Sequence, residues 1–195
     1  MGHPEAAGAV GSLYAAGVGV DQDDFKAVEW LQKSATAGSN LAKLNLGHLY
    51  LEKRGGLDGT PVGLALMEET AAQNLPQAHA QLAEIYFFGL ESADIKVDYT
   101  KAYTHALAAF QAGITFTLNM LGFMKENGYG TKLDLVEAEK YYRQAAMNGD
   151  FKAQINLGRL LCLFDLSDNF LSHVLVEITC DTKIAKNEPH VKFVS

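Results

Sequence analysis

The sequence predicts an all-α fold, a solenoid built from repeated pairs of antiparallel helices. Glycine returns at equivalent positions along the chain, at Gly11, Gly47, Gly122 and Gly158, and Ala83 occupies the one remaining place. The successive spacings are 36, 36, 39 and 36 residues, and each position lies in a similar segment, such as LGHLYLEKRG. A period in this range is typical of solenoids made of two-helix units. Function is therefore expected on an extended surface rather than in one catalytic pocket.

The first helix of each repeat is predicted from its apolar spacing. In the second repeat, Ala42, Leu46, Leu49 and Tyr50 form one apolar stripe on a helix. Gly47 lies beside that stripe, where a missing side chain lets a neighbouring helix approach closely. A glycine in mid-helix costs about 1 kcal/mol relative to alanine, so close packing is the expected compensation.

The second helix of each repeat is predicted from its two ends. Asp23, Asp98 and Asp134 each precede an alternation of small and large residues and are expected to cap a helix, with Asp134 and Glu137 forming a capping box. These aspartates are read as caps rather than as metal ligands. The helices are expected to end at a residue that tolerates positive φ, which is Gly38, Asn74, Gly113 or Gly149.

The repeat unit resembles the Sel1-like repeat family, a relative of the tetratricopeptide repeats. The shared pattern is A-x-x-x-L-G-x-L-Y, then G-x-G, then D-x-x-x-A-x-x-W/Y, then A-x-x-G, and it covers residues 2 to about 162. The resemblance implies a right-handed superhelical solenoid, an adaptor role in binding other proteins, and a concave face lined by the first helices. A cysteine-rich branch of the family is linked with β-lactam binding, but this chain lacks those cysteines.

The pattern divides the chain into an array over residues 1–164 and an atypical C-terminal cap or tail over 165–195. The repeats are expected at about 2–37, 38–73, 74–112 and 113–148, with an opening helix at 149–164. The chain begins in register with a preceding repeat, which suggests a removed upstream segment or a missing N-terminal cap. In the second repeat, the segment RGGLDGTPVG replaces the usual loop, so its second helix is expected to start late.

Composition limits the classes of partner. The 195 residues carry a net charge of −7, and the acidic residues are dispersed. Nucleic-acid binding is not expected, because phosphate neutralisation needs clustered Lys and Arg. No signal peptide opens the chain and no run reaches transmembrane length, so membrane insertion is not expected. The compartment stays open, with the cytoplasm favoured, and the oligomeric state is not predicted.

The two cysteines, Cys162 and Cys180, do not recur with the repeat. They therefore provide neither a disulfide framework nor a zinc-binding pattern. Thiols 18 residues apart can form a single disulfide, but unpaired cysteines are the expectation.

The candidate binding residues follow from the repeat register. If the apolar stripe of the second repeat faces the packing, Asn45, His48 and Glu52 share the other face at i, i+3 and i+7. The equivalent candidates are Gln81, Glu84 and Phe88 in the third repeat, Phe123 and Asn127 in the fourth, and Asn156 and Arg159 in the fifth. The first repeat offers only small side chains at these positions.

Phe88 and Phe123 are the sharpest candidates, because exposed aromatic residues in a groove are typical hot spots for peptide recognition. The alternative is that both pack against the next repeat or the longer third loop. His48 is not expected to bind a metal, since no second ligand shares its face. No metal site or cofactor is predicted.

The leading hypothesis is a non-catalytic adaptor that binds a protein or peptide along the concave face. No nucleophile–base arrangement, phosphate loop or paired-carboxylate motif appears, so no catalytic residue is predicted. The alternative is an immunity or inhibitor protein, in which an acidic solenoid covers the basic cleft of a toxin or effector enzyme. An enzyme of the β-lactam-processing type is the third and least favoured hypothesis.

Overall fold

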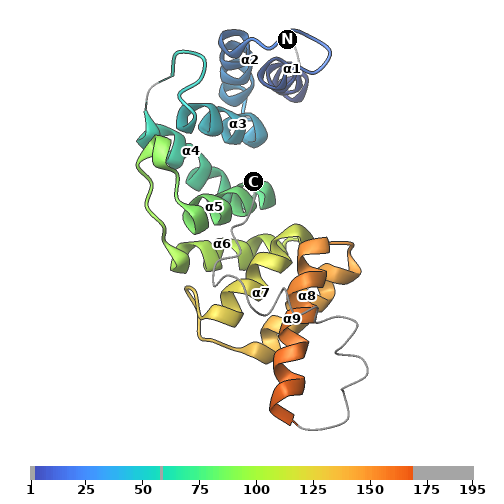
Figure 1. Ribbon diagram of the computed structural model, residues 1–195. Helices are drawn as coiled ribbons and strands as arrows, with labels where there is room; N and C mark the ends of the chain where they lie inside the picture. The colour runs from blue at the N-terminus through green and yellow to red at the C-terminus, as the bar shows by residue number, and fades with distance from the viewer. Residues whose placement is uncertain (1–2, 58, 169–195) are drawn as a thin grey trace. The chain divides into compact units, whose positions relative to one another are not determined.

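The computed structural model of the chain describes residues 3–57 and 59–168, with side chains up to Cys162 (Figure 1). The chain forms two compact units, of which the first ends at Thr117 and the second begins at Leu118. Residues 169–195, which hold most of the expected C-terminal cap or tail, lie outside the described part. That prediction stays untested.

The first compact unit contains three successive helix pairs, in which neighbouring helices pack side by side (Figure 1). The pairs are α1 (Pro4–Ala16) with α2 (Asp24–Thr36), α3 (Asn40–Leu51) with α4 (Thr60–Ala72), and α5 (Pro76–Phe88) with α6 (Tyr99–Gln111). Two short 3-10 turns, η1 (Glu91–Ala93) and η2 (Thr115–Thr117), lie in the connections around α6.

The second compact unit contains α7 (Leu118–Asn127), α8 (Leu135–Met147) and α9 (Phe151–Asp168). Helices α7 and α8 form the fourth pair, and α9 packs on α8. Across residues 3–57 and 59–168 no strand occurs, and only an isolated antiparallel bridge joins Leu90 and Ile95. The predicted all-α fold of antiparallel helix pairs is therefore confirmed.

The aspartate caps are confirmed. The Oδ1 atoms of Asp23, Asp98 and Asp134 accept hydrogen bonds from the backbone N–H three residues later, at 3.0, 3.0 and 2.9 Å. The predicted capping box at Asp134 is wrong. The Asp134 N–H donates to the Lys125 carbonyl oxygen at 2.9 Å, and the Glu137 carboxylate instead pairs with Lys125 Nζ at 2.5 Å. The loop geometry therefore occupies the donor that a capping box would need.

The predicted ends of the second helices are confirmed, whereas the predicted late start of α4 is wrong. Gly38, Asn74, Gly113 and Gly149 have φ values of 98°, 60°, 95° and 89°, as predicted for positions that follow a helix. Helix α4 does not start late. It begins at Thr60, 36 residues after the start of α2, and has the same 13-residue length. A proline in its first turn has the φ of a helix already, so no capping side chain is required.

The recurring glycine allows the first helix of a repeat to approach the second. A Cβ on Gly47 would lie 2.9 Å from the carbonyl oxygen of Gly63 on α4, and Gly11 and Gly122 are equally tight. A Cβ on Gly158 would meet no described atom within 4 Å. The predicted packing role is thus confirmed in the first, second and fourth repeats, but not in the fifth.

The expectation of unpaired cysteines is wrong for Cys162. This residue lies on α9 and is disulfide-bonded. Cys180 lies outside the described residues. The repeat register offered no signal for this bond, because the cysteines stand outside the repeat pattern.

Candidate partner-binding surface

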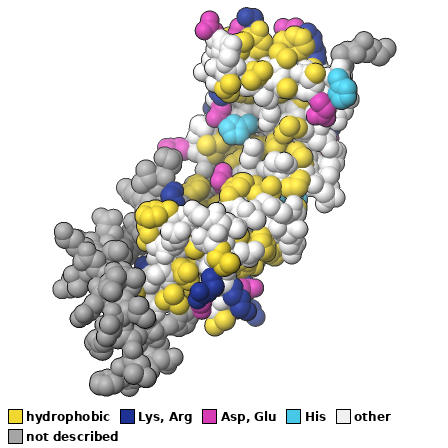
Figure 2. Space-filling view, turned by 90° about the vertical axis from the view of Figure 1, so that its right-hand side faces the viewer, with side chains coloured by type: hydrophobic (Ala, Val, Ile, Leu, Met, Phe, Trp, Pro, Cys, Tyr) yellow, Lys and Arg dark blue, Asp and Glu magenta, His cyan; other side chains and the backbone are white. Residues whose placement is uncertain are grey.

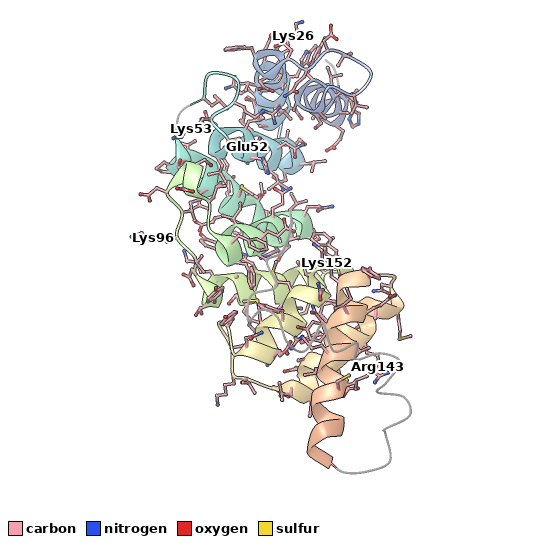
Figure 3. The ribbon with its side chains drawn as sticks, viewed as in Figure 1. Lys26, Glu52, Lys53, Lys96, Arg143 and Lys152 are labelled. Atoms are coloured by element: carbon pink, nitrogen blue, oxygen red, sulfur yellow. The ribbon has the colours of Figure 1, made fainter. Side chains whose placement is uncertain are left out.

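The candidates of the second and third repeats lie on the first helices of their pairs. His48 on α3, Glu52 at its C-terminal end, and Glu84 and Phe88 on α5 are exposed, whereas Asn45 and Gln81 are partly buried. Figure 3 labels Glu52 beside α3, and Glu52 is the C-cap residue of this helix. We call His48, Glu52, Glu84 and Phe88 the α3–α5 surface. Most of the candidate side chains in this unit are therefore exposed, as the repeat register predicts.

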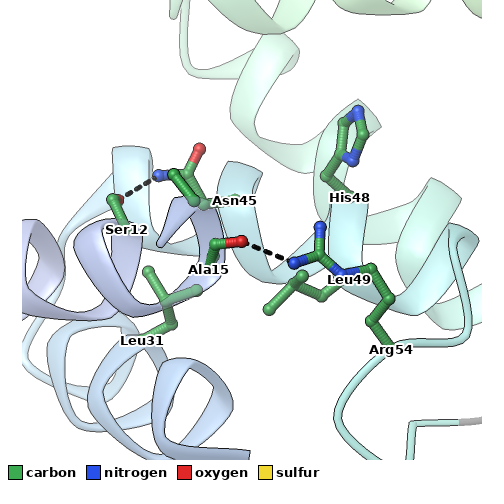
Figure 4. A pocket seen from close by; sticks show the side chains of 8 residues that line it. Ser12, Ala15, Leu31, Asn45, His48, Leu49 and Arg54 are labelled. Carbon is green, nitrogen blue, oxygen red and sulfur yellow. Dashed lines mark hydrogen bonds between the residues drawn. The ribbon is translucent and has the colours of Figure 1, made fainter. Parts of the chain in front are cut away.

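A pocket of about 270 Å³ lies beside the α3–α5 surface (Figure 4). Its walls come from α1, α2, α3 and the loop after α3, and its lining residues are Ser12, Ala15, Ala16, Leu31, Asn45, His48, Leu49 and Arg54. Asn45 Nδ2 donates to Ser12 Oγ at 2.9 Å and so ties α3 to α1 across this pocket. The pocket is large enough for a single side chain, with alanine and leucine walls and a polar rim.

Arg54 is the residue of this pocket that the sequence reasoning missed. Its guanidinium forms a two-point ion pair with Asp24, through Nη2 at 2.5 Å and Nε at 3.1 Å. Nη1 also donates to Glu52 Oε2 at 2.9 Å, and Nη2 donates to the Ala15 carbonyl oxygen at 2.6 Å. This pairing lowers the pKa of Asp24. Arg54 therefore joins three segments at one wall of the pocket.

A glycine next to Arg54 explains how the arginine reaches Asp24. Gly55 has a φ of +63°, and a Cβ there would lie 2.6 Å from the Asp24 carbonyl oxygen. Only glycine fits this close backbone approach. The sequence signal was the Arg-Gly-Gly segment, which the repeat pattern marked only as a departure from the usual loop.

Glu84 is an acidic residue of the α3–α5 surface that has no Lys or Arg partner among the described residues. Although the side chain is exposed at its surface, partial desolvation by the surrounding protein raises the pKa of its carboxyl, and the nearby His48 only partly opposes this effect. Among the described residues, no Lys or Arg forms an ion pair with Glu84. His48 itself has Nδ1 3.5 Å from Glu52 Oε2. The surface thus offers a carboxylate that a donor from another molecule would stabilise.

Gln81 lies one turn before Glu84 on α5 and holds a second unsatisfied acceptor. Its Oε1 atom is buried and has no hydrogen-bond donor in the described part of the chain. Asn45, at the equivalent position of the second repeat, satisfies its side chain through Ser12. The third repeat therefore lacks a contact that the second repeat makes.

Phe88 ends α5 with 51% of its surface exposed. Its ring meets Phe87 edge to face, with ring centroids 4.9 Å apart. About half of the side-chain surface is therefore exposed, and the ring also contacts its neighbour Phe87.

The second compact unit uses its candidate residues mainly for internal contacts. The half-buried Phe123 packs edge to face on Tyr129, with centroids 5.8 Å apart, and Asn127 Nδ2 donates to the Phe123 carbonyl oxygen at 2.8 Å. Asn156 Nδ2 donates to Asn119 Oδ1 at 3.0 Å. A role for these residues in partner binding stays a prediction.

Arg159 belongs to a partly buried network in the same unit. Its Nη2 lies 2.6 Å from Glu126 Oε2, which also accepts a hydrogen bond from the Tyr142 hydroxyl at 2.8 Å. Burial and the Glu126 charge raise the pKa of Tyr142. The Arg159 guanidinium therefore holds α9 against α7 and α8.

Charged groups are sparse on the molecular face in Figure 2, where hydrophobic side chains lie between isolated charges. Within the described ranges, no cluster of three or more His, Cys, Asp or Glu side chains could hold a metal ion. No described helix is long and apolar enough to cross a membrane.

Comparison with known proteins identifies the repeat. A sequence model of the Sel1 repeat matches residues 4–39, 76–114 and 117–150, together more than half of the chain. The pair α3–α4 lies between two matched segments and folds like its neighbours, although its loop departs from the pattern.

Relatives by sequence are much longer than this chain. An uncharacterized protein of Neisseria meningitidis serogroup B is 31% identical over 173 residues, covering 89% of this chain and 34% of the relative. The chitin synthase regulator SKT5 of Malassezia restricta is 29% identical over 139 residues, covering 71% of this chain and 10% of the regulator. The chain thus spans about a third or less of these relatives.

Solved structures show the same fold. A Sel1 repeat protein from Oxalobacter formigenes superposes with a TM-score of 0.68 at 27% identity, covering 80% of this chain and 61% of that one. A protective antigen of uropathogenic Escherichia coli with an SLR fold gives 0.70 at 28% identity, covering 80% and 33%. The repeat matches, the helix pairs and these structures agree, and the chain belongs to the Sel1 repeat family.

Proposed function

We propose that this chain is a non-catalytic interaction module whose α3–α5 surface binds a segment of a partner protein. Sel1 repeat proteins are generally protein-interaction scaffolds, and their fold is typically non-catalytic. The observation that carries the proposal is the exposed Phe88 beside an unpaired carboxylate, Glu84, near an open pocket.

The groups on this surface favour a partner segment with both cationic and apolar side chains. A Lys or Arg donor would find Glu84 without a competing ion pair, and an apolar side chain would contact the exposed part of Phe88. A small aliphatic side chain fits the pocket walls of Ala15, Ala16 and Leu49. The net charge of −7 also favours basic partners over acidic ones.

The test begins with affinity capture by the full chain and identification of the partner by mass spectrometry. Binding of the identified partner to wild type, Phe88→Ala and Glu84→Gln is then measured by isothermal titration calorimetry. A hot-spot aromatic costs about 2 kcal/mol or more on truncation, so Phe88→Ala should weaken binding at least about 30-fold.

Phe25→Ala is the matched control. Phe25 is 73% exposed but lies on α2, a second helix, away from the proposed surface. Equal partner affinity for Phe88→Ala, Glu84→Gln and wild type, with helicity intact, would exclude the α3–α5 surface. A captured enzyme that loses activity in a tight 1:1 complex would instead favour the immunity or inhibitor role.

A further inference from the structure

Two histidines of the third repeat meet across its helix pair. His79 on α5 and His105 on α6 place their Nδ1 atoms 2.9 Å apart, with ring centroids separated by 5.2 Å and ring planes tilted by 41°. Both side chains are partly buried, and neither belongs to the α3–α5 surface. At this separation the two nitrogens share one proton, because one ring must donate and the other must accept.

The surroundings of His105 favour its neutral form. Burial lowers the pKa of His105, and the neighbouring His79 lowers it further. The ring of Tyr86 stacks on His105, with centroids 5.8 Å apart and planes at 15°. A neutral imidazole keeps the lone pair that a metal ion needs.

The nearby charges come from α4 and α6 and largely balance. Glu68 accepts a hydrogen bond from the Tyr86 hydroxyl at 2.6 Å, and Lys101 Nζ lies 3.3 Å from that hydroxyl and 4.0 Å from Glu68. Glu68 raises the pKa of His105 and Lys101 lowers it, both less than burial does. A bound cation would therefore face no uncompensated positive charge.

We propose that His79 and His105 form a two-histidine site for a divalent transition metal, with Cu²⁺ as the preferred ion. Metal–imidazole bonds are about 2.0–2.1 Å long, so two nitrogens 2.9 Å apart subtend about 90° at a shared metal. That angle suits the square-planar or tetragonal geometry of Cu²⁺ and Ni²⁺ better than the tetrahedral geometry of Zn²⁺. No third protein ligand is found among the described residues, so water would fill the other positions.

Binding needs a change of tautomer and a rotation of the two rings, because the centroid separation of 5.2 Å means that the two Nδ1 atoms now point at each other. The ring that carries hydrogen on Nδ1 moves it to Nε2, and each ring turns by about 45° so that both Nδ1 lone pairs face the metal. Each ring stays neutral, and no proton is released overall. The metal would replace the shared hydrogen bond and join α5 to α6 by two coordinate bonds, which stabilises the third repeat.

The test titrates the untagged full chain with Cu²⁺ in the presence of glycine as a weak competitor, and records electron paramagnetic resonance. A His3→Gln background removes the imidazole nearest the amino terminus. We expect one Cu²⁺ with two equatorial imidazole nitrogens, and His79→Gln or His105→Gln should weaken binding roughly 100-fold by removing the chelate. His48→Gln is the matched control and should bind as tightly as the background.

Nuclear magnetic resonance keeps the proposal testable if the variants unfold. In the His3→Gln background, with His79 and His105 left in place, substoichiometric Cu²⁺ should selectively broaden the imidazole signals of His79 and His105. Equal broadening of all histidines would overturn the proposal, as would the same Cu²⁺ affinity in the background and in folded His79→Gln.

Discussion

Alanine substitution at two equivalent glycines should change stability in opposite directions. Gly47 and Gly158 occupy the same repeat position in mid-helix, so alanine gains about 1 kcal/mol of helix propensity at each. At Gly47 the new methyl group would lie 2.8 Å from Met67 Cγ and 2.9 Å from the Gly63 carbonyl oxygen. The methionine can move, but the backbone oxygen cannot move without shifting α4.

The sign of the stability change at each position depends on whether the overpacking cost or the gain in helix propensity is larger. Overpacking of this kind costs about 1–3 kcal/mol, which exceeds the gain in propensity, so Gly47→Ala should lose about 1 kcal/mol. At Gly158 no described atom lies within 4 Å of the new methyl group, so Gly158→Ala should gain up to about 1 kcal/mol. The two variants should therefore differ by about 2 kcal/mol.

Urea unfolding followed by far-ultraviolet circular dichroism measures the difference. The unfolding midpoint should fall for Gly47→Ala and rise for Gly158→Ala, with the m-value unchanged. Equal stabilisation of both variants would show that α3 and α4 can separate at little cost. The close-packing role of the recurring glycine would then be wrong.

Arg54→Met should cost about 1–2 kcal/mol, because it leaves a partly buried carboxylate without its two-point partner. Arg143→Met, which breaks an i,i+4 pair of a more exposed arginine, should cost less than about 0.5 kcal/mol. Glu84→Gln should stabilise the chain at pH 7, since ionising this carboxyl is harder in the folded state, and the gain should vanish as pH falls below the unfolded value of 4.5. His105→Gln should reduce the loss of stability on acidification below pH 6.5, because the unfolded state protonates this histidine more readily than the folded state.

Urea unfolding at a series of pH values checks these three predictions. Equal costs for the two arginine variants would contradict the role assigned to the Asp24 pair. A loss of stability in Glu84→Gln at pH 7 would mean that the ionised carboxylate has a stabilising partner. An unchanged acid limb in His105→Gln would mean that this histidine titrates alike in both states.

Most of the fold could be predicted from the repeat period. The helix pairs, the aspartate caps and the positive φ after each second helix all follow from local patterns in the sequence. The capping box failed because the Asp134 N–H already has a partner in the preceding helix, Lys125, which the local motif cannot show. The late start of α4 failed because Pro61 can open a helix without a capping side chain.

The site was harder to predict because it depends on contacts between helices. The register selected His48, Glu84 and Phe88 as exposed, and they are. It gave no sign that Arg159 forms an ion pair with Glu126, since both types of residue also occur singly on surfaces. The meeting of His79 and His105 depends on packing between two helices, for which their spacing of 26 residues is no signal.

The loop after α5 can change in length without changing the positions of the helices that it joins. The Asp98 N–H donates to the Tyr86 carbonyl oxygen at 2.8 Å, the same tie that joins Asp23 to Tyr14, although three more residues lie between its ends. Leu90 and Ile95 close the added segment on itself with two backbone hydrogen bonds of 2.8 and 3.0 Å. Because the extra chain satisfies its own backbone and closing a longer loop costs little entropy, this corner can accept inserted sequence without a change of repeat register. It is therefore a suitable place to graft a reporter peptide.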